Sequence, residues 1–461
     1  MSEKTANGVV LSEIPKPVQV IEPFQRFFKK VVGGSFCLFF TTLLALMWAN
    51  LSSTSYHHVW HTELTISLGH LQITKSLIHW IDEALMTLFF FTVGLEIKRE
   101  VLVGELASPK RALLPIAAAL GGMLFPAGIY IVLNYGTPAA RGWGVPMATD
   151  IAFSLAVLAI IGTRIPVGLK VFLSAFAIAD DLGAVLVIAL YYTQSIVWSY
   201  LVICILFLIG LAVANFFWIR WPLVYGLLGV GIWFAILGSG IHATVAGILV
   251  AMFIPAKAKY DTDAFIRTCK VHLERFECEP GSCGYSILLN PEHLNAVHDI
   301  EVACLEVETP LQRFGYSLHP WIAFMILPLF ALANSGVSLK DIDISVALAH
   351  PVTLGIMLGL LLGKPVGISL FTYLAFKIFK APLPSGVRWL HIIGASILGG
   401  IGFTMSLFIS GLSFSSDHFI EFSKLGIILG SLLSGALGLS ILSLGNISKS
   451  RLPSTGFCNN Q

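Results

Sequence analysis

Charge is scarce in this sequence. Only 12% of the 461 residues are Asp, Glu, Lys or Arg, whereas 56% are hydrophobic. So few charged side chains exclude a soluble globular domain. Runs of about twenty apolar residues are long enough to cross a bilayer, and the sequence predicts an all-α polytopic membrane protein with twelve of them. They lie at about residues 33–50, 79–97, 112–134, 144–162, 168–193, 197–218, 222–238, 240–256, 319–338, 348–376, 388–412 and 422–446.

Two other features are missing. The first thirty residues are polar and mixed, and the apolar run after them is too long for the core of a signal peptide, so no cleavable signal peptide is expected. The seven cysteines form no short paired framework, and no Cys-x-x-Cys pair is present. Reduced thiols are therefore expected, as in a cytoplasmic environment.

The distribution of basic residues predicts the orientation. An even number of spans places both termini on one side, and nearly all of the 28 Lys and Arg residues then lie on that side. The loops on the other side carry only Lys75, Arg141 and Lys340. Because cytoplasmic loops are rich in Lys and Arg, both termini are expected in the cytoplasm. The predicted parts are a cytoplasmic N-terminal segment (1–32), spans one to eight (33–256), spans nine to twelve (319–446) and a cytoplasmic tail (447–461).

Two segments outside the spans are long enough to have structure of their own. In the outer loop 51–78, apolar residues alternate on both sides of Gly69-His70, which favours a β-hairpin. Such a hairpin either caps the bundle or forms a dimer contact by edge pairing. The second segment, 257–318, is a cytoplasmic insertion with four cysteines: Cys269, Cys278, Cys283 and Cys304. A zinc site is conceivable there, but the irregular spacing favours reduced thiols.

A faint internal repeat points to a transporter. ATDIAFSL (148–155) resembles GGIGFTMSL (399–407), and Leu120-Gly121-Gly122 resembles Leu362-Gly363-Lys364. The matching spans run in opposite directions, so the repeat is inverted. Inverted repeats are typical of secondary transporters, whose sites lie where the repeats meet. The alternative is chance similarity between apolar segments.

The sequence places ionisable residues inside apolar spans. Asp150 lies in MATDIAF, Asp180 and Asp181 lie in AIADDLGAV, and Lys364 lies in LLLGKPVGI. A charge at that depth is costly and usually functional. Adjacent helical residues point about 100° apart, so Asp180 and Asp181 face different neighbours. Hard cations prefer oxygen ligands, and a site that holds either protons or a cation exchanges them by competition. The alternative is a buried salt-bridge network that stabilises the bundle.

Spans four and eleven are predicted to be discontinuous helices. Span four contains Pro146 and several glycines just before Thr149-Asp150, and span eleven carries Gly394, Gly399, Gly400 and Gly402. A break leaves backbone groups without partners and exposes partial charges, positive at N-termini and negative at C-termini. We expect Asp150 to compensate N-terminal ends and Lys364 to compensate C-terminal ends.

Four further ionisable residues lie at the ends of spans. Glu96 and Glu100 close span two at the cytoplasmic face, where a charged helix end and a role in ion entry or pH sensing are both plausible. His242, in GSGIHATVAG, is placed to sense pH or simply to pack. Asp82 is expected to be a helix-start residue at the outer face.

Seven motifs together resemble the NhaA family of sodium/proton antiporters. They are ATDIAF, ADDLGA, FTVGLEIKRE, SGIHATVAG, LHPWIAFMILPLFALANSGVSL, GKPVGISLF and GIGFTMSLFI. The resemblance implies an electrogenic, pH-dependent exchanger of the bacterial inner membrane that expels Na+ or Li+, takes up more protons than cations, and serves sodium and pH homeostasis. It implies crossing discontinuous helices, no cofactor, no nucleic acid partner and a homodimer formed through the outer, periplasmic hairpin.

The resemblance also implies a role for individual residues. Asp180 and Asp181 resemble the carboxylates that bind protons and the transported Na+, and Lys364 resembles the lysine that pairs with Asp180. Thr149 and Asp150 resemble the residues at the crossing of the unwound helices. Glu96, Glu100 and His242 fall at positions linked to pH response and cytoplasmic entry.

Two departures from the family pattern stand out. The loop before span nine is expanded by about forty residues compared with the usual short loop. The chain reads RFGYSLHPW, so Gly315 and Tyr316 stand where an acidic residue and a histidine are usual. The pH profile is therefore expected to shift, whereas exchange is expected to survive because the residues within the spans are complete.

Two other functions fit parts of the pattern. A sodium-coupled symporter for an organic anion would need a larger polar cavity, with further cationic or hydroxyl groups, than the sequence offers. An intramembrane aspartyl protease needs two carboxylates that face one water. Adjacent helical residues do not do so, and Lys364 has no part in that chemistry.

Overall fold

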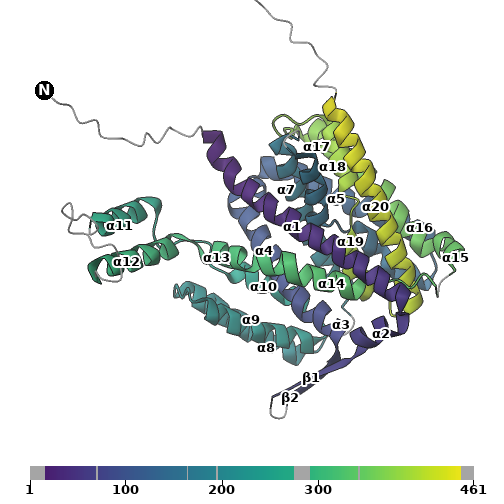
Figure 1. Cartoon of the computed structure of the whole chain (residues 1–461), viewed down its shortest axis with the longest axis horizontal. Coiled ribbons are helices and arrows are strands. Elements are labelled where there is room, and N and C mark those ends of the chain that lie inside the picture. Colours follow the sequence, from purple (N-terminus) through teal and green to yellow (C-terminus); the bar gives the residue numbers. More distant parts are fainter. Residues whose placement is uncertain are drawn as a thin grey trace, which may run out of the picture.

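The chain forms a helical bundle with one small sheet at one end (Figure 1). The structure is a computed structural model that describes residues 16–68, 71–162, 165–193, 196–274, 291–340 and 343–447. We call the end of the bundle that carries the sheet the hairpin end. The first residues of α1 (Lys16–Leu51) and the last residues of α20 (Asp417–Ile447) lie at the opposite end.

Ten helical segments of the described residues are long and apolar enough to cross a membrane. The bent pair of α18 (Trp389–Leu398) and α19 (Phe403–Ser413) raises the number to eleven. The ten are Gly33–Leu51 in α1, Leu77–Val103, Pro109–Asn134 (α5), Pro138–Ile161, Val167–Tyr191 (α7), Trp198–Phe216 (α8), Pro222–Ser239 (α9), Pro310–Asn334, Pro351–Phe379 and Asp417–Leu444 in α20. The predicted all-α, multi-span class is confirmed, while the number twelve stays a prediction.

The eighth predicted span is shorter than expected. At 240–256 the structure has α10 (Thr244–Phe253), a helix of ten residues. It packs against α4 (Met86–Val103), and Lys98 of α4 donates hydrogen bonds of 2.6 and 2.5 Å to the carbonyls of Met252 and Ile254. The lysine therefore compensates the negative C-terminal end of a short helix.

Several composite segments begin or bend at identifiable residues. The segment Pro310–Asn334 contains α13 (Pro310–Trp321), the π-helical turn η6 (Ile322–Ile326) and α14 (Leu327–Asn334). α13 begins at Pro310, inside the segment predicted as insertion, because Thr309 and Gln312 form a capping box. The segment Pro351–Phe379 contains α16 (Pro351–Leu358), the π-helical turn η7 (Gly359–Gly363) and α17 (Lys364–Phe379), and α15 (Ile344–Ala349) precedes it.

The role expected for Asp82 is wrong. The second segment begins with α3 (Leu77–Trp80), directly after a strand, and Asp82 lies in the following π-helical turn η1 (Ile81–Leu85). Asp82 instead accepts a hydrogen bond of 2.8 Å from Asn334 Nδ2. The strand leads straight into the helical segment at Leu77, so Asp82 lies in the second turn of that segment and not at its start.

The predicted β-hairpin is present. β1 (Glu63–Leu68) pairs antiparallel with β2 (Leu71–Ser76), and Thr65 faces Thr74 with hydroxyl oxygens 2.9 Å apart. Gly69 and His70 lie outside the described residues. α2 (Ser53–His61) precedes the hairpin, and Trp80 donates a hydrogen bond of 3.1 Å to the Leu64 carbonyl. This bond joins the hairpin to the first turn of the following span.

The insertion contains a pair of helices that projects from the bundle (Figure 1). α11 (Thr262–Glu274) packs against α12 (Pro291–Val307). Lys259 Nζ lies 2.8 Å from Glu306 Oε2, and this hydrogen bond raises the pKa of Lys259. Cys269 and Cys304 are free, and Cys278 and Cys283 lie outside the described residues. Within the described residues, no group of three His, Cys, Asp or Glu side chains is placed to hold a metal.

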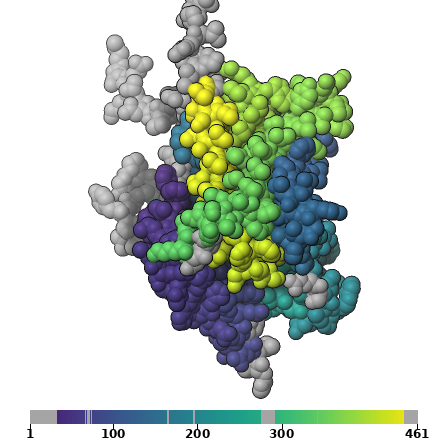
Figure 2. Space-filling view, turned by 90° about the vertical axis from the view of Figure 1, so that its right-hand side faces the viewer, coloured from purple at the N-terminus to yellow at the C-terminus, as the bar shows by residue number. Residues whose placement is uncertain are grey.

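The outer surface of the bundle is apolar. Figure 2 shows one face, to which α20 (yellow) and α15 to α17 (green) contribute. Phe36 and Phe40 of α1, Leu432 of α20 and Val366 of α17 are all more than half exposed. A surface of this kind is unfavourable in water and stable against lipid tails.

The apolar contacts divide most of the helices into two groups. In the first group, α5, α7, α17, α18 and α6 (Ile151–Ile161) share one cluster, and α16, α19 and α20 pack onto it. In the second group, α4, α8, α9, α10 and α13 share another, and α1, η1 and α14 pack beside it. A third cluster, with Phe90, Phe330 and Phe408, joins the two groups. We call them the first and second helix groups.

Within the first group, α5 and α17 touch backbone to backbone. A Cβ atom added to Gly121 would collide with the Gly367 carbonyl oxygen, and one added to Gly367 would collide with the Gly121 carbonyl oxygen. Small residues at such positions let membrane helices approach closely. Lys364 lies at the first position of α17, so this contact also positions its side chain relative to α5.

Gly121→Ala should destabilise the protein, whereas Gly128→Ala on the same helix should not. The first methyl group has no room, and overpacking costs about 1–3 kcal/mol or more. The second meets no atom within 4 Å and removes a flexible residue from a helix. Thermal unfolding in detergent, followed by intrinsic fluorescence, measures both variants. Equal midpoints for the two would show that the α5–α17 contact is not tight.

Candidate ion-binding site

Two helix interruptions lie against each other in the first helix group. In span four, the 3-10 helix η3 (Pro138–Met147) gives way to three extended residues before α6 begins at Ile151. In span eleven, Gly399–Gly402 separate α18 from α19, whose axes differ by 45°. Pro146 and the glycines disfavour continuous α-helix at these places, as the sequence predicts.

The interruptions provide hydrogen-bond partners for each other. The Asp150 N–H donates to the Ile401 carbonyl at 2.6 Å, and the Thr149 hydroxyl donates to the Gly399 carbonyl at 2.9 Å. Ser154 donates to the Leu398 carbonyl at 2.9 Å. Backbone groups exposed by a break have no water to bond inside a bilayer. The segments 148–154 and 398–401 therefore depend on each other.

The Asp150 carboxylate lies between two helix N-termini. Oδ1 accepts a hydrogen bond from Phe153 N of α6 at 3.0 Å. Oδ2 accepts one from Thr404 N of α19 at 3.0 Å and a second from the Thr404 hydroxyl at 2.5 Å. The side chain is buried. One negative charge thus faces two positive helix ends, which is the compensation expected for Asp150.

Lys364 forms a buried ion pair with Asp180. Nζ lies 2.7 Å from Asp180 Oδ2, and both side chains are 0% exposed. Nζ also donates to the Thr149 hydroxyl at 2.6 Å, and that hydroxyl donates in turn to the Gly399 carbonyl. The Thr149 hydroxyl therefore links the ammonium to the C-terminal end of α18 through two hydrogen bonds. Lys364 faces the negative end of that helix through this hydroxyl and not by direct contact.

Asp181 lies beside this pair but faces another direction. It is 1% exposed, and its Oδ1 has no hydrogen-bond partner among the described residues. Asp180 Oδ1 likewise has none. The other charged groups close enough to influence Asp181 are Asp180, Asp150, Glu96 and Lys364. A buried carboxylate oxygen without a partner is costly, and a proton or a cation on Asp181 Oδ1 removes that cost. The two free oxygens can accept one.

Glu96 and Glu100, towards the C-terminal end of α4, lie in different surroundings. Glu96 is partly buried and within electrostatic range of Asp181. Glu100 Oε2 accepts a hydrogen bond of 3.0 Å from Glu105 N, in the short 3-10 helix η2 (Glu105–Ala107). The structure therefore brings Glu96 towards the buried carboxylates and places Glu100 at the start of the next connection.

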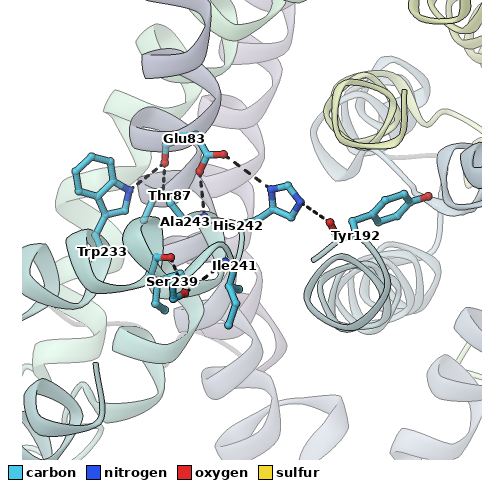
Figure 3. A network of polar contacts seen from close by, with 9 residues as sticks. Glu83, Thr87, Tyr192, Trp233, Ser239, Ile241, His242 and Ala243 are labelled. Carbon is cyan, nitrogen blue, oxygen red and sulfur yellow. Dashed lines mark hydrogen bonds and ion pairs between the residues drawn. The ribbon is translucent and has the colours of Figure 1, made fainter. Parts of the chain in front are cut away.

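His242 belongs to a network at the hairpin end (Figure 3). Its Nδ1 lies 3.9 Å from Glu83 Oε1, and its Nε2 lies 3.2 Å from the Tyr192 carbonyl at the end of α7. Glu83 Oε2 accepts a hydrogen bond from Ala243 N at 3.0 Å. The Glu83 carbonyl accepts one from Trp233 Nε1 at 3.2 Å. The imidazole thus connects η1, in the second helix group, with α7, in the first.

Three residues of these networks were not selected from the sequence. Thr404 is one of several hydroxyl residues in α19, and such residues are common in membrane helices. Glu83 directly follows Asp82, and only Asp82 of this pair was a candidate from the sequence. Tyr192 takes part through its carbonyl oxygen, which no side-chain pattern reveals. Only the threonine carried a sequence signal, because it follows the glycine-rich break.

The fold and the site define a class. The chain is a multi-span helical membrane protein with a buried Lys–Asp pair beside an interrupted helix. The adjacent buried Asp181 has an oxygen without a hydrogen-bond partner among the described residues. The Na+/H+ antiporter 1 family model matches residues 25–442. The chain belongs to that family.

Individual relatives cover nearly the whole chain. The chain is 46% identical over 430 residues to the Na(+)/H(+) antiporter NhaA of Oleidesulfovibrio alaskensis, which covers 93% of this chain and 95% of that protein. It is 44% identical over 429 residues to Na(+)/H(+) antiporter NhaA 2 of Syntrophotalea carbinolica, with 93% and 98% covered. It is 44% identical over 418 residues to the Na(+)/H(+) antiporter NhaA of Helicobacter pylori, with 90% and 93% covered. The resemblance to the NhaA family is confirmed.

Thr404→Val should lower stability, and Thr372→Val should not. The first change removes the hydroxyl that donates to Asp150, and losing a hydrogen bond to a charged group costs about 1.5–3 kcal/mol. Thr372 is equally buried, and its hydroxyl has no hydrogen-bond partner in the described part of the chain. Thermal unfolding compares these matched substitutions. A midpoint for Thr404→Val no lower than that for Thr372→Val would contradict the importance of the Asp150 contact.

Proposed function

We propose that this protein exchanges sodium ions for protons across a bacterial inner membrane. The relatives named above are Na(+)/H(+) antiporters, and this chain carries the chemical groups that such an exchange needs. The observation that carries the proposal is the buried Asp181 Oδ1, which has no hydrogen-bond partner among the described residues, next to the buried Asp180–Lys364 pair. Na+ is the substrate, Li+ is accepted as a similar hard cation, and no cofactor takes part.

Asp181 and Asp180 are the proposed cation and proton ligands. Each has one oxygen without a hydrogen-bond partner among the described residues. Sodium prefers oxygen ligands, as other hard cations do. A proton and a cation neutralise the same carboxylates, so binding of one displaces the other. Alternating access follows when the first helix group moves against the second and carries the site with it.

The ion pair supports an exchange that moves net charge. When Na+ occupies both carboxylates, Asp181 releases its proton and Lys364 loses its partner. A buried ammonium without a partner disfavours its charged form, so Lys364 releases a second proton. Two protons then leave as one cation binds, and the exchange is electrogenic. Thr149 and Asp150 hold the interrupted helices around the site while this happens.

The proposal extends to topology and assembly. Both termini lie in the cytoplasm, as the distribution of Lys and Arg supports. The hairpin then lies on the periplasmic side, where an exposed two-stranded edge suits pairing with a second copy. Glu96 and Glu100 lie at the cytoplasmic entrance. The proposed physiological role is sodium and pH homeostasis.

Asp181→Asn should abolish exchange. The amide cannot release a proton, and it carries no charge for Na+ to balance. The measurement uses everted vesicles from a host without its own sodium/proton antiporters, acidified by respiration. A dye sensitive to the pH difference reports proton exit when NaCl, LiCl or KCl is added.

Asp343→Asn is the matched control, because Asp343 is an exposed helix-capping residue outside the site. Sodium should collapse the pH gradient in the parent and in this control. A normal sodium response in Asp181→Asn vesicles would remove Asp181 as a ligand. No response in the parent, with the protein present in the membrane, would overturn the exchange function itself.

His242 and Glu83 should determine the pH dependence of exchange together. Both side chains are at most one-fifth exposed, and a partly exposed ion pair contributes up to about 1 kcal/mol. Replacing either residue by Gln removes this contact and should therefore change the pH profile of exchange. The double variant should shift it no further than one single variant, because both changes remove one contact. Additive shifts would show that the two residues act separately. The exposed His58 replaced by Gln is the control.

A further inference from the structure

A second lysine lies inside an apolar helix. Lys424 stands in the sequence KLGIILGSLL of α20 and is partly buried. It takes no part in the site formed by Lys364, Asp180 and Asp181. A lysine within a membrane span is costly and normally has a partner or a function.

The contact of Lys424 crosses the boundary between the helix groups. Its Nζ donates to the Gly336 carbonyl at 3.4 Å. α20 belongs to the first helix group, whereas Gly336 lies two residues after the end of α14, in the second group. The ammonium thus connects two groups that the exchange mechanism must move relative to each other.

The end of α14 presents carbonyl oxygens that need donors. The Tyr56 hydroxyl lies 2.9 Å from the Leu332 carbonyl and 2.7 Å from the Ala333 carbonyl, and it accepts a hydrogen bond of 3.1 Å from Gly336 N. The C-terminal end of a helix carries partial negative charge. The positive charge of Lys424 compensates that end from the other group.

A carboxylate of the second group adds to this attraction. Asp82, Glu421 and Asp417 are the acidic groups close enough to influence the Lys424 ammonium. Glu421 and Asp417 belong to α20 itself, but Asp82 belongs to η1 and is held by Asn334 at 2.8 Å. Charge attraction therefore acts across the boundary as well as within α20.

The turn that carries Lys424 is connected to the ion-binding site. Its neighbour Ser423 is hydrogen-bonded to Ser410 of α19, and the Phe422 carbonyl accepts a hydrogen bond of 3.0 Å from Thr353 of α16. α19 begins at the interruption and donates to Asp150 through Thr404. A displacement of α19 therefore also displaces Lys424.

Two aromatic contacts also cross the boundary between the helix groups. The Phe408 ring of α19 lies 5.4 Å from the Phe90 ring of α4 and 6.3 Å from the Phe330 ring of α14, measured between centroids. Asp82 precedes Phe90 by eight residues, which is about 12 Å along a helix. The Lys424 contact thus lies towards the hairpin end from these rings, at the outer part of the same boundary.

We propose that Lys424 is a positioning residue for sodium/proton exchange. Its ammonium holds the hairpin ends of the two helix groups together in the conformation described here, and the contact must break when the groups separate at that end. The inference rests on the proposed function, because only a transporter needs such a separation. Without the charge, conformations open at the hairpin end become more populated.

Thiol labelling at Ala333→Cys tests the proposal. Ala333 is 1% exposed and lies one residue before Asn334. The seven native cysteines are first replaced by serine or alanine, and the protein is placed in lipid nanodiscs. A membrane-impermeable thiol reagent then reports how often the introduced thiol becomes accessible. No ion gradient is present, so the labelling rate does not depend on exchange.

Lys424→Met should raise the labelling rate about tenfold, the effect of losing one hydrogen bond to a charged group. Asp82→Asn should raise it less. Lys424→Arg, which keeps the charge, should label and exchange like the parent. Lys377→Met is the matched control, because that exposed lysine of α17 lies over the Tyr373 ring of the same helix.

An unchanged rate in Lys424→Met, or an equal rise in Lys424→Arg, would overturn the proposal. If Lys424→Met does not fold, the Asp82→Asn variant provides the test. An unchanged labelling rate in that variant would also overturn the proposal. A protein that exchanges sodium but shows equal labelling rates would contradict this inference alone. A protein with the expected labelling pattern but no exchange would contradict the proposed function, whereas the role of Lys424 in holding the two helix groups together would stand.

Discussion

Compensation of helix ends inside an apolar bundle is the constraint on which the site depends. Two helices are interrupted where no water can satisfy their ends. The Asp150 carboxylate accepts hydrogen bonds from two helix N-termini, and Lys364 is linked to a helix C-terminus through the Thr149 hydroxyl. These charges stabilise the breaks, so the helix ends beside Asp180 and Asp181 are already compensated. In the proposed exchange, a cation or proton at Asp181 is therefore not needed to hold the interruptions together.

The same principle recurs away from the site. Lys98 compensates the end of α10, and Lys424 compensates the end of α14. In each case a short or interrupted helix leaves carbonyl oxygens at a depth where solvent cannot reach them. Lysines within or beside the spans thus cap helix ends. Where the lysine belongs to a different helix group from the carbonyl, as with Lys424, the same hydrogen bond also joins the two groups.

Much of the fold and of the site could be predicted from residues whose chemistry is local. Pro146 and the glycines of span eleven marked both interruptions, alternating apolar residues marked the hairpin, and isolated charges marked Asp150, Asp180, Asp181 and Lys364. The spacing of Thr309 and Gln312 is that of a capping box, which is a sequence signal for the start of α13 at Pro310. The partners could not be predicted. Thr404, Tyr192 and Gly336 take part through one hydroxyl and two carbonyl groups, and only tertiary packing brings those atoms into range.

The contact between Gly121 and Gly367 has a consequence for how the ion pair can be broken. Backbone touches backbone there, so α17 cannot slide or tilt freely on α5. Asp180 belongs to α7, which also packs on α5. The helix that carries the lysine and the helix that carries the aspartate therefore both pack on α5. In the proposed exchange, a proton or a cation at the carboxylate parts the two charges, rather than a sliding of α17 on α5. The trigger of that cycle is then chemical, and the movement of the helix groups is its result.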